Sequence, residues 1–202
     1  MTRQKPYYQD KWVINDNQNL VFSESNWHSL APLFENYHYL KRMPAGILAC
    51  YALYDKDKIL MPVGGAVFCN GRIQYDGKFL EFSRLWVSDD YPTNIESWFV
   101  GKCLKDLQNK FPDFLGVVTW ADLGRGHKGT IYLACNFVFD GKSRSVKRYK
   151  SGNRIIYQRT VLNPNQFQEM NADIPKNRFI YYFDKKTREA KRCSQSVMAM
   201  EI

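Results

Sequence analysis

The segment Val117–Phe137, VVTWADLGRGHKGTIYLACNF, begins as an apolar strand and then enters a glycine-rich turn. Gly124, Gly126 and Gly129 have the spacing G-x-G-x-x-G found in dinucleotide-binding loops. In those loops the glycines open a helix long enough to cross back over a sheet. Here only residues 130 to about 135 can be helical before the next apolar run. The segment therefore predicts a short strand–turn–helix unit of another fold.

The same turn also differs from the phosphate-binding loop of nucleoside triphosphatases. That loop needs a lysine directly after its last glycine, whereas Lys128 precedes Gly129. The glycines are explained as a tight turn, which they form for steric reasons. The turn alone does not explain why Asp122, His127 and Tyr132 follow the strand so closely. Polar groups that converge on the carboxyl end of a strand make a plausible site.

The flanking sequence predicts helices and strands around one central sheet. Apolar periodicity favours an amphipathic helix at 26–40 and a second helix at 91–111, where Thr93 and Glu96 have capping-box spacing. Apolar runs predict an antiparallel meander at 46–55, 62–71 and 79–88, a buried strand at 113–122 and a strand near 138–141. The order predicts an α+β or mixed α/β fold in a single domain spanning 1–202.

Composition narrows the class of protein. Of the 202 residues, 45% are hydrophobic, which indicates a packed globule. We find no apolar run long enough for a membrane span and no apolar signal core near residue 1, so we expect a soluble cytoplasmic protein. The five cysteines include no C-x-x-C pair and the chain has only three histidines. This pattern predicts reduced thiols and no metal site.

The net charge of +9 is concentrated in one region. Residues 1–140 hold 15 Lys and Arg and 15 Asp and Glu, whereas residues 141–202 hold 14 and 5. Tyrosines and phenylalanines interrupt this basic region, which we expect to be rich in β-strands. Basic residues interleaved with aromatic ones favour double-stranded DNA as the partner, although a merely solvated basic face has the same composition.

Four pieces of the chain resemble known proteins. The order of elements around IYLACNF resembles the GCN5-related N-acetyltransferase superfamily. HYLKRMP, EFSRLWVSDDYPTNIES, TWADLGRGHKGTIYLACNFVFDG and KNRFIYYF are similar to the Mom family of bacteriophage DNA-modification proteins. The resemblance implies a phage or prophage enzyme in the host cytoplasm. It would transfer a small carbamoylmethyl-type group to N6 of adenine and so protect phage DNA from restriction. It also implies acetyl-CoA or another acyl-type donor, and iron, as candidate cofactors.

The resemblance also implies roles for single residues. The family's functional positions would be Tyr39, Arg84, Ser97 and Asp122, and the superfamily's helix tyrosine would be Tyr132. Candidate contacts with the donor are Trp86, Val87, Asn94, Ser97 and Asn136. Candidate contacts with DNA are His38, Lys147, Arg148, Lys150, Arg154 and Arg178. The loop DDYPTNIES lacks the glycines that would bring backbone N–H groups close to a pyrophosphate, and Asp89 and Asp90 oppose an anion there.

Each candidate also has an ordinary structural explanation. Asp122 would accept a proton from the adenine amine or orient it, or else only cap the following turn. Tyr132 would protonate a leaving group or be a buried tyrosine with one hydrogen bond.

The remaining candidates likewise have both a functional and a structural explanation. Arg84 would contact a ligand or pair with Glu81 or Asp122. Ser97 would bind the donor or be an ordinary first-turn serine. Tyr39, beside His38, would stack on the extruded base or pack on the surface. His127 would contribute to a metal site, move a proton or be solvated.

Three functions compete on the sequence alone. The leading one is transfer of a small group to N6 of adenine in DNA. The second is an N-acetyltransferase acting on a protein or a small amine. The third is a DNA-binding anti-restriction protein without catalysis. The sequence leaves the oligomeric state open.

Overall fold

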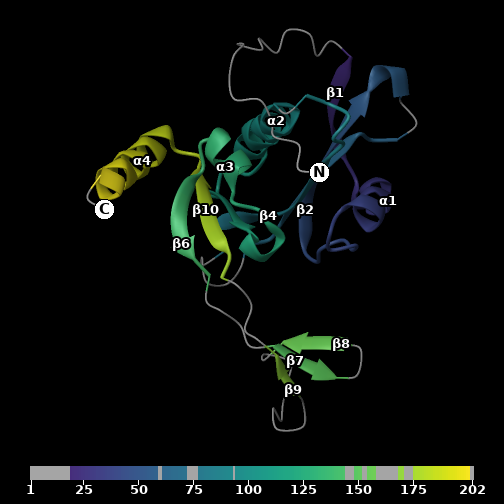
Figure 1. The fold of residues 1–202 in the computed structure, drawn as a ribbon. Helices are drawn as coiled ribbons and strands as arrows, with labels where there is room; N and C mark the ends of the chain where they lie inside the picture. Colours follow the sequence, from purple (N-terminus) through teal and green to yellow (C-terminus); the bar gives the residue numbers. More distant parts are fainter. Residues whose placement is uncertain are drawn as a thin grey trace.

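Seven strands form one mixed sheet at the centre of the protein (Figure 1). In spatial order they are β1 (Leu20–Ser25), β2 (Ile47–Asp55), β3 (Gly64–Cys69), β4 (Phe79–Val87), β5 (Gly116–Ala121), β10 (Asn177–Tyr182) and β6 (Val138–Lys142). Neighbours are antiparallel except β4 and β5, which are parallel. The computed structural model describes residues 19–58, 61–71, 77–92, 94–143, 148–151, 154–157, 168–170 and 175–200. It confirms the mixed α/β fold with a mostly antiparallel central sheet.

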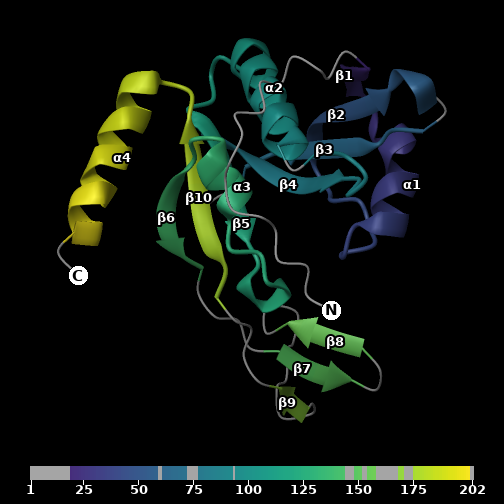
Figure 2. The same cartoon turned by 45° about the horizontal axis from the view of Figure 1, so that its top comes forward.

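Helices α1 (Trp27–Tyr37) and α2 (Ile95–Lys110) cover opposite faces of the sheet (Figure 2). Buried side chains alternate along β2, so Tyr51 packs with Phe99 of α2, whereas Cys50 packs with the α1 side. Each large apolar side chain buried this way contributes roughly 1.5–3 kcal/mol. The alternation of one strand therefore places a helix on each face and builds two cores.

Helix α1 is shorter than the expected 26–40. It begins after Asn26, whose side chain accepts a hydrogen bond of 2.9 Å from the Ser29 N–H. It ends at Tyr37 because His38 has an extended backbone, with ψ of 140°. The three residues that follow Tyr37 form a turn instead, and this turn matters for the site below. Helix α2 begins after Asn94, and Thr93 of the expected capping box lies outside the described residues.

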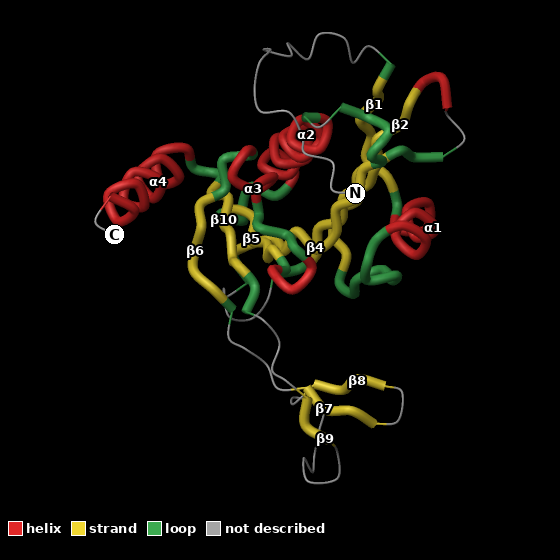
Figure 3. The backbone as a smooth tube through the Cα atoms, in the orientation of Figure 1, coloured by secondary structure: helices red, strands yellow, loops and turns green. Residues whose placement is uncertain are grey.

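The basic carboxyl-terminal region contains more than the expected strands. Strands β7 (Arg148–Ser151), β8 (Arg154–Tyr157) and β9 (Gln168–Met170) form a separate three-stranded sheet. Strand β10, however, lies between β5 and β6 in the central sheet, and α4 (Lys185–Met200) is a 16-residue helix that the β-rich expectation missed (Figure 3). The Lys, Arg, Glu and Ala residues of α4 are good helix formers.

Shorter elements complete the described chain. These are η1 (Lys56–Lys58), η3 (Leu123–Arg125) and α3 (Thr130–Ala134). Cys50, Cys69, Cys103 and Cys135 are buried thiols and Cys193 is an exposed one. Within the described residues, no helix combines the length and the apolar character that a membrane span requires.

Candidate active site

Strands β4 and β5 pair over only three residues and then diverge. The pairs are Phe79 with Gly116, Leu80 with Val117 and Glu81 with Val118. Beyond them β4 continues beside β3, and β5 continues beside β10. The Thr119 hydroxyl donates a 3.1 Å hydrogen bond to the Phe82 carbonyl at the point of divergence. A wedge therefore opens between two central strands of the sheet.

A β-bulge in β4 coincides with the start of this wedge. Val67 of β3 opposes Arg84 while Phe68 opposes Phe82, so Ser83 is an additional residue in β4. Such a bulge bends a strand and shifts all later side chains to the opposite face. Strict alternation would place Arg84 in the core beside Phe82. The bulge places it on the α1 side of the sheet instead.

Arg84 is held by backbone carbonyl groups. Its Nε donates to the Arg42 carbonyl at 3.3 Å and its Nη1 donates to the Ser83 carbonyl at 2.7 Å. Burial lowers the pKa of the Arg84 guanidinium below its usual value, and the group remains cationic. The carboxylate of Asp122, a candidate ion-pair partner, is engaged by Lys176 instead.

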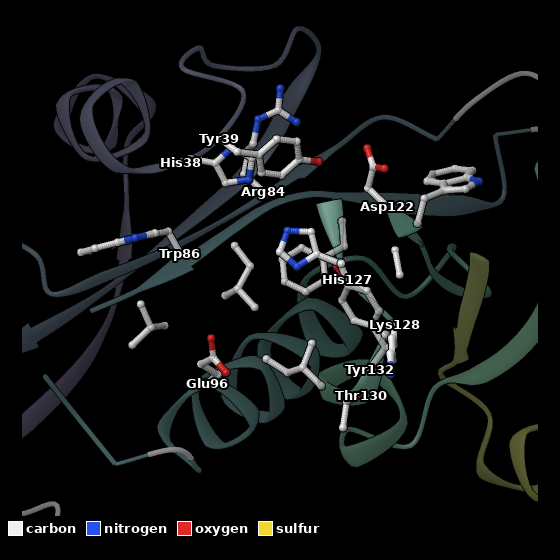
Figure 4. A pocket seen from close by; sticks show the side chains of 18 of the residues that line it. His38, Tyr39, Arg84, Trp86, Glu96, Asp122, His127, Lys128, Thr130 and Tyr132 are labelled. Carbon is white, nitrogen blue, oxygen red and sulfur yellow. The ribbon is translucent and has the colours of Figure 1, made fainter. Parts of the chain in front are cut away.

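The wedge contains a cavity of about 500 Å³. Its walls come from the carboxyl half of β4, the end of β5, the turn after α1 and the segment from Gly126 to Tyr132. Figure 4 shows that Tyr39, Arg84, Asp122, His127 and Tyr132 reach this one space from those separate elements. A volume of this size suits a small ligand or a single base. The structure therefore brings together four of the five predicted catalytic residues, and Glu96 and Lys128 also line the cavity.

Asp122 has both carboxylate oxygens engaged. Oδ1 accepts a hydrogen bond of 3.1 Å from the Gly124 N–H, and Oδ2 lies 2.8 Å from Nζ of Lys176. Asp122 thus caps the turn and lines the cavity at once. Lys176 was missed as a site residue. Strand β10 pairs with β5 so that Asn177 opposes Ala121, which sets Lys176 opposite Asp122, and only this long-range register reveals the pair.

Tyr39 links two loops at the edge of the cavity. Its ring centroid lies 5.7 Å from that of His127, and the Arg125 guanidinium carbon lies 5.7 Å from the same ring. Tyr39 is 38% exposed, so part of the residue remains accessible at the site. Tyr39 therefore packs on surface residues and also lies at the edge of the cavity.

Tyr132 lies on α3 within an aromatic cluster. Its ring centroid is 5.5 Å from that of Phe179 and 6.0 Å from that of Phe82. Burial raises the pKa of the Tyr132 phenol, and a hydrogen bond with the Thr119 side chain opposes this rise. The phenol therefore stays protonated at neutral pH, which suits a proton donor and excludes a base.

The predicted donor contacts separate into two groups. Trp86 and Val87 line the cavity, and Trp86 stacks on Tyr37 with centroids 4.8 Å apart. Ser97, Asn94 and Asn136 do not line it. The Ser97 hydroxyl donates to the Asn94 carbonyl at 3.0 Å, the behaviour of an ordinary first-turn serine. The Asn136 side-chain oxygen accepts from Arg192 of α4 at 2.8 Å.

The start of α2 does not fit the pyrophosphate of coenzyme A. The turn from β4 to α2 contains no glycine, and Asp89 and Glu96 line the cavity on this side. Their carboxylates would repel a phosphate that approached the helix N-terminus. Among the described residues no group of three or more His, Cys, Asp or Glu could hold a metal ion, so the expectation of iron gains no support here.

Two of the predicted DNA contacts, His38 and Arg178, lie outside the three-stranded sheet. His38 is 7% exposed, and burial, followed by Arg84, His127 and Lys41, lowers its pKa from 6.5 to about 4. A buried imidazole does not face surface phosphates, but His38 lines the cavity beside Tyr39, so its contact with an extruded base stays a prediction. Arg178 forms an ion pair of 2.6 Å with Asp140.

The other predicted DNA contacts lie in or beside the three-stranded sheet. Lys150 is exposed on β7. Arg148 and Arg154 belong to β7 and β8. Lys147 lies outside the described residues.

Comparisons with solved structures identify the fold. NAA60 of Arabidopsis thaliana in complex with acetyl-CoA matches with a TM-score of 0.52 and 12% identity over 81% of this chain and 99% of that one. A spermidine N-acetyltransferase from Vibrio cholerae matches with a TM-score of 0.51 and 10% identity over 83% and 96%. At such low identities the likeness shows the fold alone. The central sheet with its diverging parallel pair is therefore the GCN5-related acetyltransferase fold.

Comparisons of sequence identify the family. The chain is 36% identical over 67 residues to the methylcarbamoylase mom of Escherichia phage Mu. This match spans 33% of the chain and 28% of the phage protein. The model of the Mom protein family matches residues 20–198, nearly the whole length. The chain thus belongs to the Mom protein family.

Proposed function

We propose that the protein is a transferase that places a small acyl-type or carbamoylmethyl-type group on N6 of adenine in DNA. One observation carries the proposal: the cavity between β4 and β5 joins an accessible aromatic ring and a carboxylate in a member of the Mom family. The name of the phage Mu relative, a methylcarbamoylase, supports the type of group. The modified base would protect phage DNA from restriction.

The chemistry of adenine explains why both groups are needed. The N6 amine is a weak nucleophile because its lone pair is delocalised into the ring. An enzyme that modifies it must extrude the base from the stack and hold it at a positioned acceptor. Tyr39 offers the ring on which the extruded base would stack. Asp122, fixed by Gly124 and Lys176, would accept the hydrogen bond or the proton of the amine.

Arg84 and Tyr132 would act on the group that is transferred. The remaining N–H groups of the Arg84 guanidinium would bind the carbonyl oxygen of the group: in transfer of an acyl group they would stabilise the negative charge that develops there, and in transfer of a carbamoylmethyl group they would orient its amide. The protonated phenol of Tyr132 would deliver a proton to the leaving group. Because the start of α2 does not fit a pyrophosphate, we assign no step to coenzyme A.

Mass spectrometry of nucleosides tests the proposal. DNA from bacteria that express the protein is digested and its adenosine pool is weighed beside DNA from cells with an empty vector. We expect an additional, heavier adenosine species. Asp122→Ala should abolish it, whereas Asp113→Ala, at an exposed carboxylate in the turn before β5, should leave it unchanged.

Different outcomes would support the competing functions. An unmodified adenosine pool with acetylated polyamines or proteins would indicate an N-acetyltransferase of the ordinary kind. An unmodified pool with DNA binding that survives the double substitution Arg84→Ala/Asp122→Ala would indicate a non-catalytic DNA-binding protein.

A further inference from the structure

Two loops meet at one edge of the cavity and carry a net positive charge. The first, residues 38–46, follows α1, and the second, residues 122–129, connects β5 to α3. Together they contain four Lys or Arg residues and one acidic residue, Asp122, which forms an ion pair with Lys176. These four are Lys41, Arg42, Arg125 and Lys128, and all are exposed. They belong to residues 1–140, where basic and acidic residues are equal in number, so the net charge of that region does not reveal a basic surface.

Contacts of Tyr39 hold the two loops together. Its ring meets His127 and the Arg125 guanidinium of the second loop. Arg84 joins the first loop to β4 through the Arg42 carbonyl. Arg125 therefore lies over the aromatic ring at the cavity edge, Lys41 and Arg42 follow that ring closely in the chain, and Lys128 lines the cavity. The electrostatic effect reaches His38, where Arg84, His127 and Lys41 reinforce the lowering of the pKa by burial.

The charge changes sign across the cavity. Glu96 and Asp89 line it near the start of α2, at a distance in the chain from both loops. Figure 4 shows Glu96 on the opposite side of the space from Tyr39 and Arg84. DNA phosphates would therefore be attracted to the edge formed by the two loops and repelled from the edge near α2.

Several cations of the carboxyl-terminal region have structural partners, and among the loop cations Nζ of Lys41 donates to the Asn36 carbonyl. Arg178 pairs with Asp140, and Arg188 donates to the Tyr182 carbonyl and lies over the Tyr181 ring. Arg192 donates to Asn136. These contacts stabilise the edge formed by β6, β10 and α4. The excess charge of residues 141–202 thus overstates the capacity of the described part of that region to bind phosphates.

We propose that Lys41, Arg42, Arg125 and Lys128 form the surface that binds the phosphates of duplex DNA on either side of the target base, with Tyr39 beside Arg125 at the edge of the cavity. This inference rests on the proposed function, and it assigns the position of the duplex on the protein. The phosphate contacts orient the duplex, and the base beside Tyr39 enters the cavity. Cations next to an aromatic ring combine contacts to phosphates with a surface on which an extruded base can stack.

The salt dependence of DNA binding tests this surface. Fluorescence anisotropy measures the affinity for a short labelled duplex between roughly 50 and 200 mM salt. The logarithm of the binding constant falls linearly with the logarithm of the salt concentration, and each lost phosphate contact lowers the magnitude of this slope by about 1. We expect Lys41→Gln/Arg42→Gln and Arg125→Gln/Lys128→Gln each to lower the slope by about 2. Two matched double variants, Lys102→Gln/Lys105→Gln on α2 and Lys185→Gln/Lys186→Gln on α4, replace exposed lysines elsewhere and should retain the wild-type slope.

The outcomes separate this inference from the proposed function. The proposed phosphate-binding role of the loops would be rejected by any of three results. These are an unchanged salt slope in both loop variants, a lowered slope only in the α4 variant, and a wild-type protein that does not bind DNA. Loop-dependent binding with an unmodified adenosine pool would support the surface and reject the transferase. Circular dichroism on the loop variants checks that they remain folded.

Discussion

Nζ of Lys176 lies 2.8 Å from Oδ2 of Asp122, across the antiparallel pair of β10 and β5. Because Gly124 N–H binds the other oxygen, the carboxylate is fixed at both ends. A charge-assisted contact of this length orients its acceptor. We therefore expect Lys176 to position Asp122.

Replacement of Lys176 should separate positioning from DNA contact. We expect Lys176→Met to lower kcat for group transfer at least tenfold while KM for DNA changes little, and Lys176→Arg to retain most of the activity. Steady-state kinetics with a duplex substrate measures both values. A higher KM with an unchanged kcat would identify Lys176 as a phosphate contact instead.

Protonation of His38 should destabilise the protein in mild acid. Its pKa is about 4 in the folded protein and 6.5 when unperturbed. The unfolded chain therefore binds the proton first, so the stabilisation is complete above about pH 6.5 and is lost as pH falls toward 4. With solvent screening allowed for, this corresponds to roughly 2 kcal/mol. Urea unfolding at pH 7.5 and pH 4.5 measures it.

A substitution at His38 supplies the control for this pH effect. The Nδ1 atom of His38 accepts a 3.1 Å hydrogen bond from the Leu40 N–H, which the side-chain oxygen of asparagine can replace. His38→Asn should reduce the loss of stability on acidification, whereas His28→Asn, at an exposed histidine, should not. An equal loss in both variants would contradict the assignment to His38.

Gly129 should tolerate no side chain. Its φ is +91° and a Cβ atom would overlap the ring of Phe179, which is buried. Backbone strain of about 1–2 kcal/mol adds to overpacking of about 1–3 kcal/mol. Gly126 has φ of +78° with open space around a Cβ, so Gly126→Ala should show the strain alone. Thermal unfolding of both variants compares them, and equal melting temperatures would refute the clash.

Thr119 should hold the two strands at the point where they diverge. Thr119→Val keeps the shape but removes the hydrogen bond to the Phe82 carbonyl, leaves a buried acceptor without it, and also removes the hydrogen bond with the Tyr132 phenol. Such a loss costs about 1–3 kcal/mol. Denaturant unfolding measures this cost, and Thr119→Ser, which restores the hydroxyl, should recover most of it. A Val variant as stable as the wild type would show that the strands diverge without this bond.

Local pattern predicted most elements of the fold, and the exceptions have physical reasons. The strands at 47–55, 64–69 and 79–87 and the helix at 95–110 follow from their apolar periodicity. Strand β1 (LVFSES) carries no such run, because an edge strand with half-exposed side chains needs little apolar character. Helix α4 was missed because the basic and aromatic composition of its surroundings was interpreted as strand.

The sequence by itself determined the family and the central sheet, and its resemblance to that family named Tyr39, Arg84, Asp122 and Tyr132 as candidates. Only the tertiary structure decided which side chains share the cavity. One additional residue, Ser83, reverses the face of Arg84, and the pairing of β10 with β5 sets Lys176 opposite Asp122. Both effects depend on strand register, which arises from contacts between residues distant in the chain, so no local pattern encodes them.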